Sequence, residues 1–165
     1  MVSLGTGAGI TARDMMTTNL VTVREPMRVL EAVRTLLKSK VSGAPVVDEK
    51  GHLVGMLSEK DGIKALLRAV HERLPSAIVA DVMTREVTTV HESTDMLTIA
   101  HLFVTQPVRR VPVVRDDGKL VGQISRRDLL ATAVDVWDES PRREAAVLYL
   151  SATGRTTPFG GPRRR

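Results

Sequence analysis

The stretch that decides the fold is Val41-Ser-Gly-Ala-Pro-Val-Val-Asp-Glu-Lys-Gly-His-Leu-Val-Gly-Met-Leu-Ser-Glu-Lys-Asp61. It is typical of two short apolar strands joined by a turn, followed by a helix that opens at Ser58-x-x-Asp61. The pattern returns as Val108-Arg-Arg-Val-Pro-Val-Val-Arg-Asp-Asp-Gly-Lys-Leu-Val-Gly-Gln-Ile-Ser-Arg-Arg-Asp128, with every matching residue 67 positions further on. A gapless repeat of this length indicates one supersecondary unit used twice and packed against its own copy.

Composition narrows the class of protein. The chain of 165 residues is long enough for one domain or two small packed repeats, and its 42% hydrophobic content allows a core. Aromatic residues make up only 2%, so that core must be aliphatic. The absence of cysteine excludes disulfides, thiolate metal sites and a cysteine nucleophile. We find no membrane-spanning run and no signal-peptide pattern, so we expect a cytoplasmic protein without a membrane partner.

The positive charge is concentrated at one end of the chain. Of 24 Lys+Arg and 19 Asp+Glu, residues 141–165 hold six arginines and one glutamate, which leaves the rest balanced at 18 and 18. Neutral repeats argue against a nucleic-acid-binding core, which should carry a basic face. Arg163-Arg164-Arg165 would give only weak, salt-sensitive attraction to nucleic acid or an anionic membrane.

The elements expected in the two repeats follow one order. In the first repeat we predict a short strand, a helix, a hairpin and a second helix. Pro26 is expected in the first turn of the first helix, and Gly43 where the chain leaves that helix. The second helix is expected to be capped near Ser58. In the second repeat, Ser93 is the expected cap of the first helix. The strands are expected over 20–23, 44–47, 53–57, 87–90, 111–114 and 120–124, with the last helix from Arg126 to about Val136.

These elements give expected boundaries. We expect a flexible N-terminus over 1–12, repeats over 13–73 and 81–136, and a linker over 74–80. The C-terminal extension over 137–165 has a possible short helix over 144–150 and is expected to be mostly disordered after 151.

Three motifs, each present twice in the same order, resemble those of a known family. They are Asp14-x-Met-Thr17 with Asp81-x-Met-Thr84, the Val-x-x-x-Pro-Val-Val strands, and Gly55-x-x-Ser-x-x-Asp61 with its copy at Gly122. The repeat resembles the cystathionine-β-synthase (CBS) domain, and the pair, over about 14–132, resembles a Bateman module. The resemblance implies an α/β fold, a tandem CBS-domain pair of two β-α-β-β-α repeats with pseudo-two-fold symmetry. It also implies two inter-repeat clefts that commonly bind adenine nucleotides or other adenosyl compounds, a regulatory role, and association into a disc-shaped dimer through the helices.

The Ser-x-x-Asp segments carry the site chemistry. An aspartate after a strand can accept hydrogen bonds from ribose hydroxyls, and a helix N-terminus favours phosphate. The resemblance implies that the clefts cross between repeats. One would contain Thr17, Val21, Val41, Ser42, Gly43, Ala44, Pro45, Ser125, Arg126, Arg127 and Asp128; the other would contain Ser58, Lys60, Asp61, Thr84, Val87, Thr88, Val108, Arg109, Arg110, Val111 and Pro112. Arg109-Arg110 would either clamp phosphate or fill the second cleft.

Two other interpretations remain at this point. Ser-x-x-Asp is also an ordinary helix cap, in which case the module is a dimeric scaffold with empty clefts. The Arg-rich tail leaves open a nucleic-acid-associated protein. The four histidines lack metal-ligand spacing, and we find no nucleophile–base order or carboxylate pair, so we expect neither a metal site nor an enzyme. The favoured hypothesis is a homodimeric sensor that needs no cofactor, binds AMP, ADP, ATP or another adenosyl ligand, and signals to a separate effector protein.

Overall fold

The computed structural model describes residues 9–72 and 77–139. Residues up to Leu129 form one compact unit, and the rest of the last helix belongs to a second unit. The predictions for residues 1–8, for the helix over 144–150, for disorder after 151, for the arginine tail and for residues 74–76 of the linker lie outside the described residues. Of the expected N-terminal segment over 1–12, Ala12 begins a short helix, and the last helix runs to Glu139 rather than to about Val136. Among the helices that the model describes, none is long and apolar enough to cross a bilayer.

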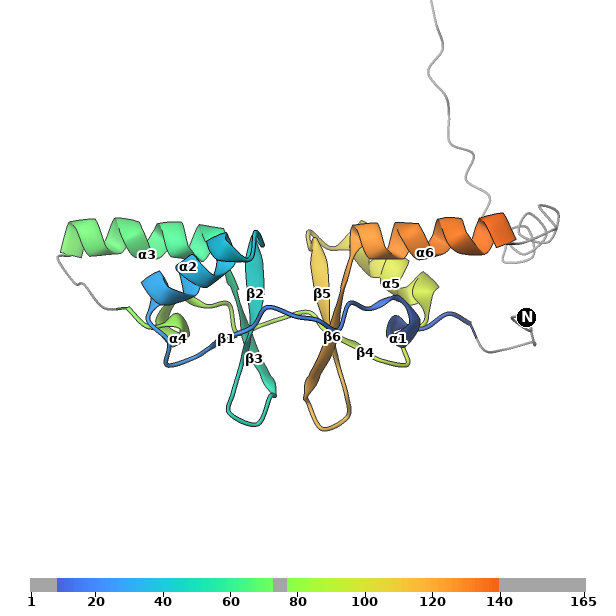
Figure 1. Cartoon of the computed structure of the whole chain (residues 1–165), viewed down its shortest axis with the longest axis horizontal. Coiled ribbons are helices and arrows are strands. Elements are labelled where there is room, and N and C mark those ends of the chain that lie inside the picture. Colours follow the sequence, from blue (N-terminus) through green and yellow to red (C-terminus); the bar gives the residue numbers. More distant parts are fainter. Residues whose placement is uncertain (1–8, 73–76, 140–165) are drawn as a thin grey trace, which may run out of the picture. The chain divides into compact units, whose positions relative to one another are not determined.

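The first repeat is a three-stranded sheet with helices around it (Figure 1). Its elements in chain order are α1 (Ala12–Met15), β1 (Val23–Arg24), α2 (Val29–Lys38), β2 (Gly43–Val47), β3 (Leu53–Ser58) and α3 (Glu59–Glu72). β1 pairs in parallel with β2. β2 and β3 form the predicted antiparallel hairpin.

The second repeat has the same topology and the same register. Val23 faces Val46 in the first sheet, and Val90 faces Val113, 67 residues later, in the second. The register also shifts at the same place, between Val46 and Val47 and between Val113 and Val114. The mixed α/β fold predicted from the repeat is therefore confirmed. The elements are α4 (Val79–Val82), β4 (Val90–His91), α5 (Met96–Thr105), β5 (Arg110–Val114), β6 (Leu120–Ser125) and α6 (Arg126–Glu139).

Several local predictions were wrong by a few residues. The first strand of each repeat begins later than expected, because the segment before it crosses to the other repeat. Pro26 lies in the turn before α2, and the chain leaves α2 through Lys40, which has a φ of 54°, with Gly43 already in β2. Asp95, not Ser93, caps α5: its carboxylate accepts from the Thr98 N–H at 3.0 Å. Ser93 instead bonds the His91 ring at 2.7 Å.

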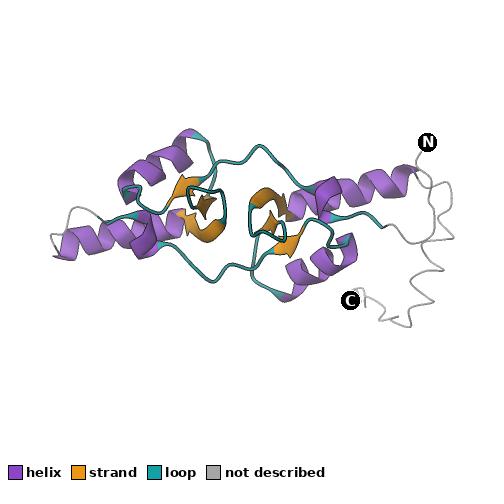
Figure 2. Cartoon of the chain, turned by 90° about the horizontal axis from the view of Figure 1, so that it is seen from below, coloured by secondary structure: helices purple, strands orange, loops and turns teal. Residues whose placement is uncertain are grey.

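Each hydrophobic core is completed by a segment from the other repeat. Ala12 and Met15, in α1, are buried in the core of the second repeat. Val79 and Met83, in and just after α4, are buried in the core of the first. The two linking loops run between the sheets in opposite directions (Figures 1 and 2). The two repeats are therefore interlocked by exchange of their leading segments.

Backbone bridges fix these crossings. The Thr17 N–H donates to the Gln123 carbonyl at 2.9 Å, and the Gln123 N–H donates to the Thr17 carbonyl at 3.0 Å. Met56 and Thr84 exchange the same pair of bonds at 2.8 and 2.9 Å. The neighbouring glycine, Gly55, leaves room for this approach, because a Cβ there would lie 2.9 Å from the Thr84 carbonyl oxygen and 2.7 Å from Met83 Sδ.

Gly55→Ala should therefore destabilise the protein by about 1–3 kcal/mol, because the added methyl group must displace backbone as well as a side chain. Urea denaturation of the full chain measures the change. Gly9→Ala is the control, since a Cβ at Gly9 meets nothing within 4 Å. Equal stability of the two variants would contradict a tight crossing at β3.

The hairpin turns are stabilised by a carboxylate. Asp48 accepts hydrogen bonds from the Lys50 and His52 N–H groups at 2.9 and 2.8 Å, and from His52 Nδ1 at 2.8 Å. The His52 ring bond is the main reason that the pKa of Asp48 lies below its ordinary value of 3.8. Gly51, at the end of this turn, has a φ of 85°, as predicted for a hairpin glycine.

Because its pKa is depressed in the folded state, Asp48 contributes stability above the unfolded pKa that is lost as pH falls through the folded value. The melting temperature of Asp48→Asn should therefore fall less than that of the parent between about pH 5 and about pH 3. Melting curves across this range measure the difference. Glu49→Gln, in the same turn, should follow the parent; parallel curves for all three proteins would refute the role of Asp48.

Candidate functional site

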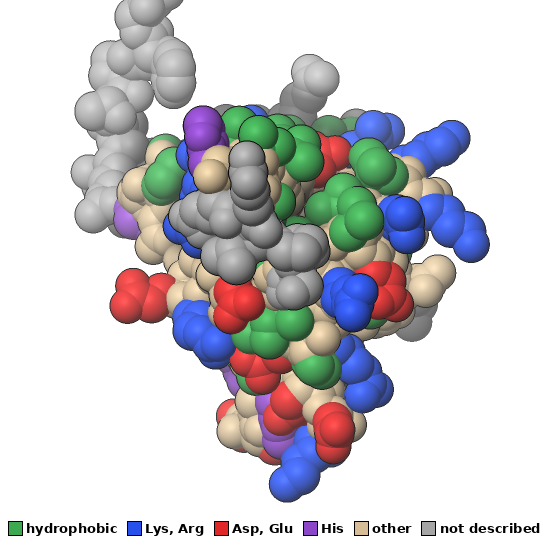
Figure 3. All heavy atoms as spheres, turned by 90° about the vertical axis from the view of Figure 1, so that its left-hand side faces the viewer, with side chains coloured by type: hydrophobic (Ala, Val, Ile, Leu, Met, Phe, Trp, Pro, Cys, Tyr) green, Lys and Arg blue, Asp and Glu red, His purple; other side chains and the backbone are tan. Residues whose placement is uncertain are grey.

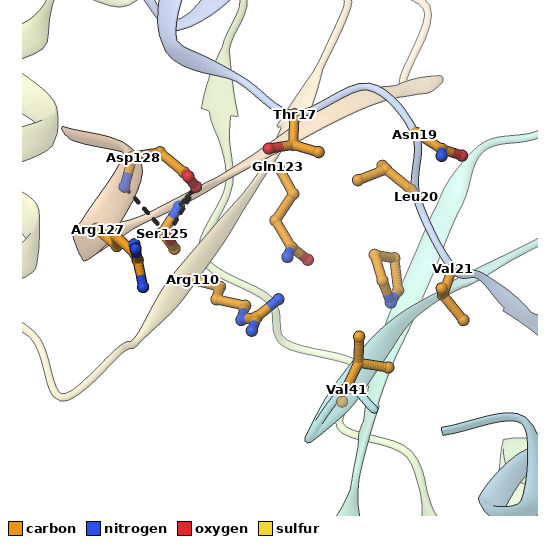
Figure 4. Close-up of a pocket in the computed structure, with 12 residues that line it drawn as sticks. Thr17, Asn19, Leu20, Val21, Val41, Arg110, Gln123, Ser125, Arg127 and Asp128 are labelled. Carbon is orange, nitrogen blue, oxygen red and sulfur yellow. Dashed lines mark hydrogen bonds between the residues drawn. The ribbon is translucent and has the colours of Figure 1, made fainter. Parts of the chain in front are cut away.

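A cavity of about 340 Å³ lies where the two repeats meet (Figure 4). Its walls come from the crossing segment before β1, from the start of β2, and from β5, β6 and the first residues of α6. All of these belong to the same compact unit. The lining residues are Thr17, Asn19, Leu20, Val21, Val41, Gly43, Pro45, Arg110, Gln123, Ser125, Arg127 and Asp128.

Ser125 and Asp128 form a closed capping pair at one end of the cavity. Asp128 Oδ2 accepts from the Ser125 N–H at 2.7 Å and from Ser125 Oγ at 2.6 Å, and Ser125 Oγ accepts from the Asp128 N–H at 3.2 Å. Ser125 and Asp128 therefore form the helix cap that the Ser-x-x-Asp pattern predicts. Only Oδ2 of Asp128 has a hydrogen-bond partner among the described residues, so Oδ1 remains an acceptor for a ligand.

The equivalent pair in the first repeat differs at its second oxygen. Asp61 Oδ2 accepts from the Ser58 N–H at 3.0 Å and from Ser58 Oγ at 2.6 Å. Asp61 Oδ1, however, is 3.5 Å from Lys64 Nζ. The two Ser-x-x-Asp segments therefore share a backbone role but offer different chemistry to a ligand.

Most of the residues predicted for the first cleft line the cavity. They are Thr17, Val21, Val41, Gly43, Pro45, Ser125, Arg127 and Asp128. Ser42, Ala44 and Arg126 do not line it. Ala44 is fully buried in the first core, because alternate residues of β2 face opposite sides of the sheet.

The residues predicted for the second cleft do not line this cavity, except one. Arg110, expected there, instead lies in the described cavity beside Ser125, its partner across β5 and β6. Val111 is fully buried in the second core, and the Thr88 hydroxyl donates to Gln106 Oε1 at 3.0 Å. The others outside the cavity are Ser58, Lys60, Asp61, Thr84, Val87, Val108, Arg109 and Pro112.

Sequence reasoning missed three lining residues, Asn19, Leu20 and Gln123. Asn19 and Leu20 were missed because the segment before β1 is an extended crossing rather than the predicted strand. Gln123 was missed because it lies within a strand whose other residues are mostly apolar. It could have been recognised because it interrupts the repeat: the residue 67 positions earlier is the apolar Met56.

The lining set suits binding of a polar, negatively charged molecule. It contains two arginines, one aspartate, and hydroxyl and amide groups, together with the apolar side chains of Leu20, Val21 and Val41. Within the described residues, no group of histidines and carboxylates could hold a metal ion. The arrangement offers charge-assisted hydrogen bonds at one end and aliphatic contact at the other.

Comparison with known proteins gives the family. The CBS domain model matches residues 12–68 and 79–135. Protein MJ1225 of Methanocaldococcus jannaschii is 32% identical over 125 residues, which cover 76% of this chain and 43% of that relative. The chain thus spans less than half the length of that relative.

Two solved structures share the fold. The CBS-pair protein CBSX2 of Arabidopsis thaliana, in complex with AMP, is 33% identical with a TM-score of 0.68, and the match covers 78% of this chain and 98% of that one. The CBS domain pair of protein MJ0100, in complex with 5′-methylthioadenosine and S-adenosyl-L-methionine, is 27% identical with a TM-score of 0.64, covering 76% and 97%. With two family matches, one on each repeat, the chain belongs to the CBS domain family and contains two of these domains in tandem.

Proposed function

We propose that this chain is a regulatory module that binds an adenine nucleotide or related adenosyl compound in the cavity and signals to a separate protein. The observation that carries the proposal is the cavity itself, which is lined by two arginines, by an Asp128 whose Oδ1 has no partner within the described part of the chain, and by aliphatic side chains at the other end. The AMP complex of CBSX2 and the adenosyl complexes of MJ0100 support this ligand class. ADP and ATP belong to the same class.

The placement of the cavity suggests how binding is transmitted. Val41 and Pro45 come from the first repeat, whereas Ser125 and Asp128 come from the second. A ligand that contacts both repeats must change the free energy of their packing, and a coupling of about 1–3 kcal/mol is enough for regulation. Ser125 Oγ donates its proton to Asp128 within the helix cap, so we infer binding rather than catalysis, with no cofactor required.

AMP should raise the melting temperature of the parent protein, because a ligand that binds only the folded state stabilises it. Asp128→Ala should abolish this shift by removing the ribose acceptor. Asp95→Ala is the matched control: it also removes a helix-capping carboxylate, but outside the cavity. A thermal-shift titration with AMP, ADP, ATP and 5′-methylthioadenosine measures all three proteins. An undiminished shift in Asp128→Ala would exclude this site.

A second candidate function, a dimeric scaffold, has its own observation. Leu30 and Leu37 on α2 are each 63% exposed, and the residues 67 positions later on α5, Leu97 and Val104, are 59% and 85% exposed. On α3, Ile63, Leu66, Leu67 and Val70 are also exposed. Figure 3 shows several apolar side chains in the upper part of this face, the side on which α2 and α3 lie, with Lys and Arg side chains beside them. These exposed apolar residues recur at equivalent positions of the two repeats. Such a surface is suited to packing against a second copy of this chain, because a two-fold interface must be self-complementary.

Leu66→Glu should therefore shift the full chain from dimer to monomer, because a charge at an apolar contact must be desolvated. Sedimentation equilibrium measures the mass. Thr22→Glu, an exposed position outside the helices, is the control. A monomeric parent, or a dimer unchanged by Leu66→Glu, would refute the helical interface.

A further inference from the structure

The two Ser-x-x-Asp segments lie in different surroundings, although the backbone repeats without a gap. Aligning the halves at 67 residues matches Ser125 with Ser58 and Asp128 with Asp61. Several positions around them change in character. Among them, Arg110 corresponds to Gly43, Gln123 to Met56, and Arg126 to Glu59.

Gln123 is the buried polar side chain that the fold does not explain. It is 8% exposed, and its Oε1 has no hydrogen-bond partner in the described part of the chain. A buried acceptor without a partner is destabilising, and native structures contain few of them. The backbone of Gln123 is fixed by both bonds to Thr17, and its amide points into the cavity beside Arg110 in Figure 4. Met56, its counterpart, has no such group to satisfy.

Charge distinguishes the two segments further. Three arginines, Arg110, Arg126 and Arg127, accompany Asp128, and two of them line the cavity. At the equivalent positions of the first repeat stand Gly43, Glu59 and Lys60, beside an aspartate whose second oxygen is already near Lys64. The charged residues that line the cavity, Arg110, Arg127 and Asp128, sum to +1, which favours a phosphate, whereas Lys60 and Asp61 of the first repeat sum to zero.

We propose that the regulatory ligand is an anionic nucleotide, bound once per chain in the described cavity. Arg110 and Arg127 hold its phosphate, and Gln123 Oε1 accepts a hydrogen bond from an N–H or O–H of its nucleoside part. The segment around Ser58 and Asp61 serves as a helix cap only. This inference rests on the proposed function. It adds the charge of the ligand, the number of ligands bound per chain, and the residues that distinguish an anionic nucleotide from other adenosyl compounds.

Isothermal titration of the full chain with AMP, 5′-methylthioadenosine and S-adenosyl-L-methionine tests the charge and the stoichiometry. These ligands share the adenosyl group, but the first is an anion, the second is uncharged and the third carries a sulfonium cation. We expect one AMP per chain, bound more tightly than the other two and more weakly as salt rises. Two AMP per chain, or equal affinity for all three, would overturn the inference and leave the proposed function intact. No binding of any of them would overturn both.

Matched variants test the residues. Arg110→Gln should weaken AMP at least about tenfold and leave 5′-methylthioadenosine unchanged, whereas Arg109→Gln, exposed and outside the cavity, should change neither. Gln123→Met, similar in size, should weaken both ligands roughly fivefold, and Met56→Gln should not. Asp61→Ala should keep the stoichiometry and affinity of the parent. Equal effects within either matched pair, or loss of AMP binding in Asp61→Ala, would refute the assignment.

Discussion

The structure depends on the exchange of leading segments between the repeats. Each hairpin supplies two strands of a three-stranded sheet, and the core of that sheet includes a short helix from the other half. The exchange is fixed by paired backbone hydrogen bonds, Thr17 with Gln123 and Met56 with Thr84, at points where glycine lets the chains approach. Two small units, each of which would bury too little apolar surface alone, thereby complete each other's cores.

The same crossing forms the site. The chain between Thr17 and Val21 runs past the end of β6 before it enters the first sheet, and this brings residues of both halves around one cavity. Ser125 and Asp128 lie at one end of this cavity. They cap α6 through one carboxylate oxygen, and the other oxygen is unpartnered among the described residues. A structural cap and a ligand contact are therefore compatible in one side chain, because a carboxylate has more acceptor positions than the cap uses.

The sequence predicted the architecture well because the repeat is gapless. Adding 67 to the residue numbers of each strand pair in the first sheet gives the corresponding pair in the second sheet. The family motifs are repeated at the same offset. Local choices were less predictable. Ser93 and Asp95 are both of types that cap helices, but Asp95 caps α5, and Ser93 bonds the His91 ring instead. Gln123 was predicted as one more residue of an apolar strand. Arg110 was predicted for the other cleft, because the sequence does not show which cleft its side chain faces. These are matters of side-chain direction in three dimensions, which the residue pattern does not encode.

The exchange of segments also has a consequence for biosynthesis. The core of the first repeat includes Val79 and Met83, so during translation it stays incomplete until the chain beyond the first repeat has left the ribosome. Ala12 and Met15, by contrast, are made before the rest of the core that they join, and they must wait for residues near 124. Their docking thus closes a loop of more than a hundred residues, and such distant pairings slow folding. A truncated transcript that ends between the repeats would yield a polypeptide with an open apolar surface, a natural substrate for chaperones and proteases.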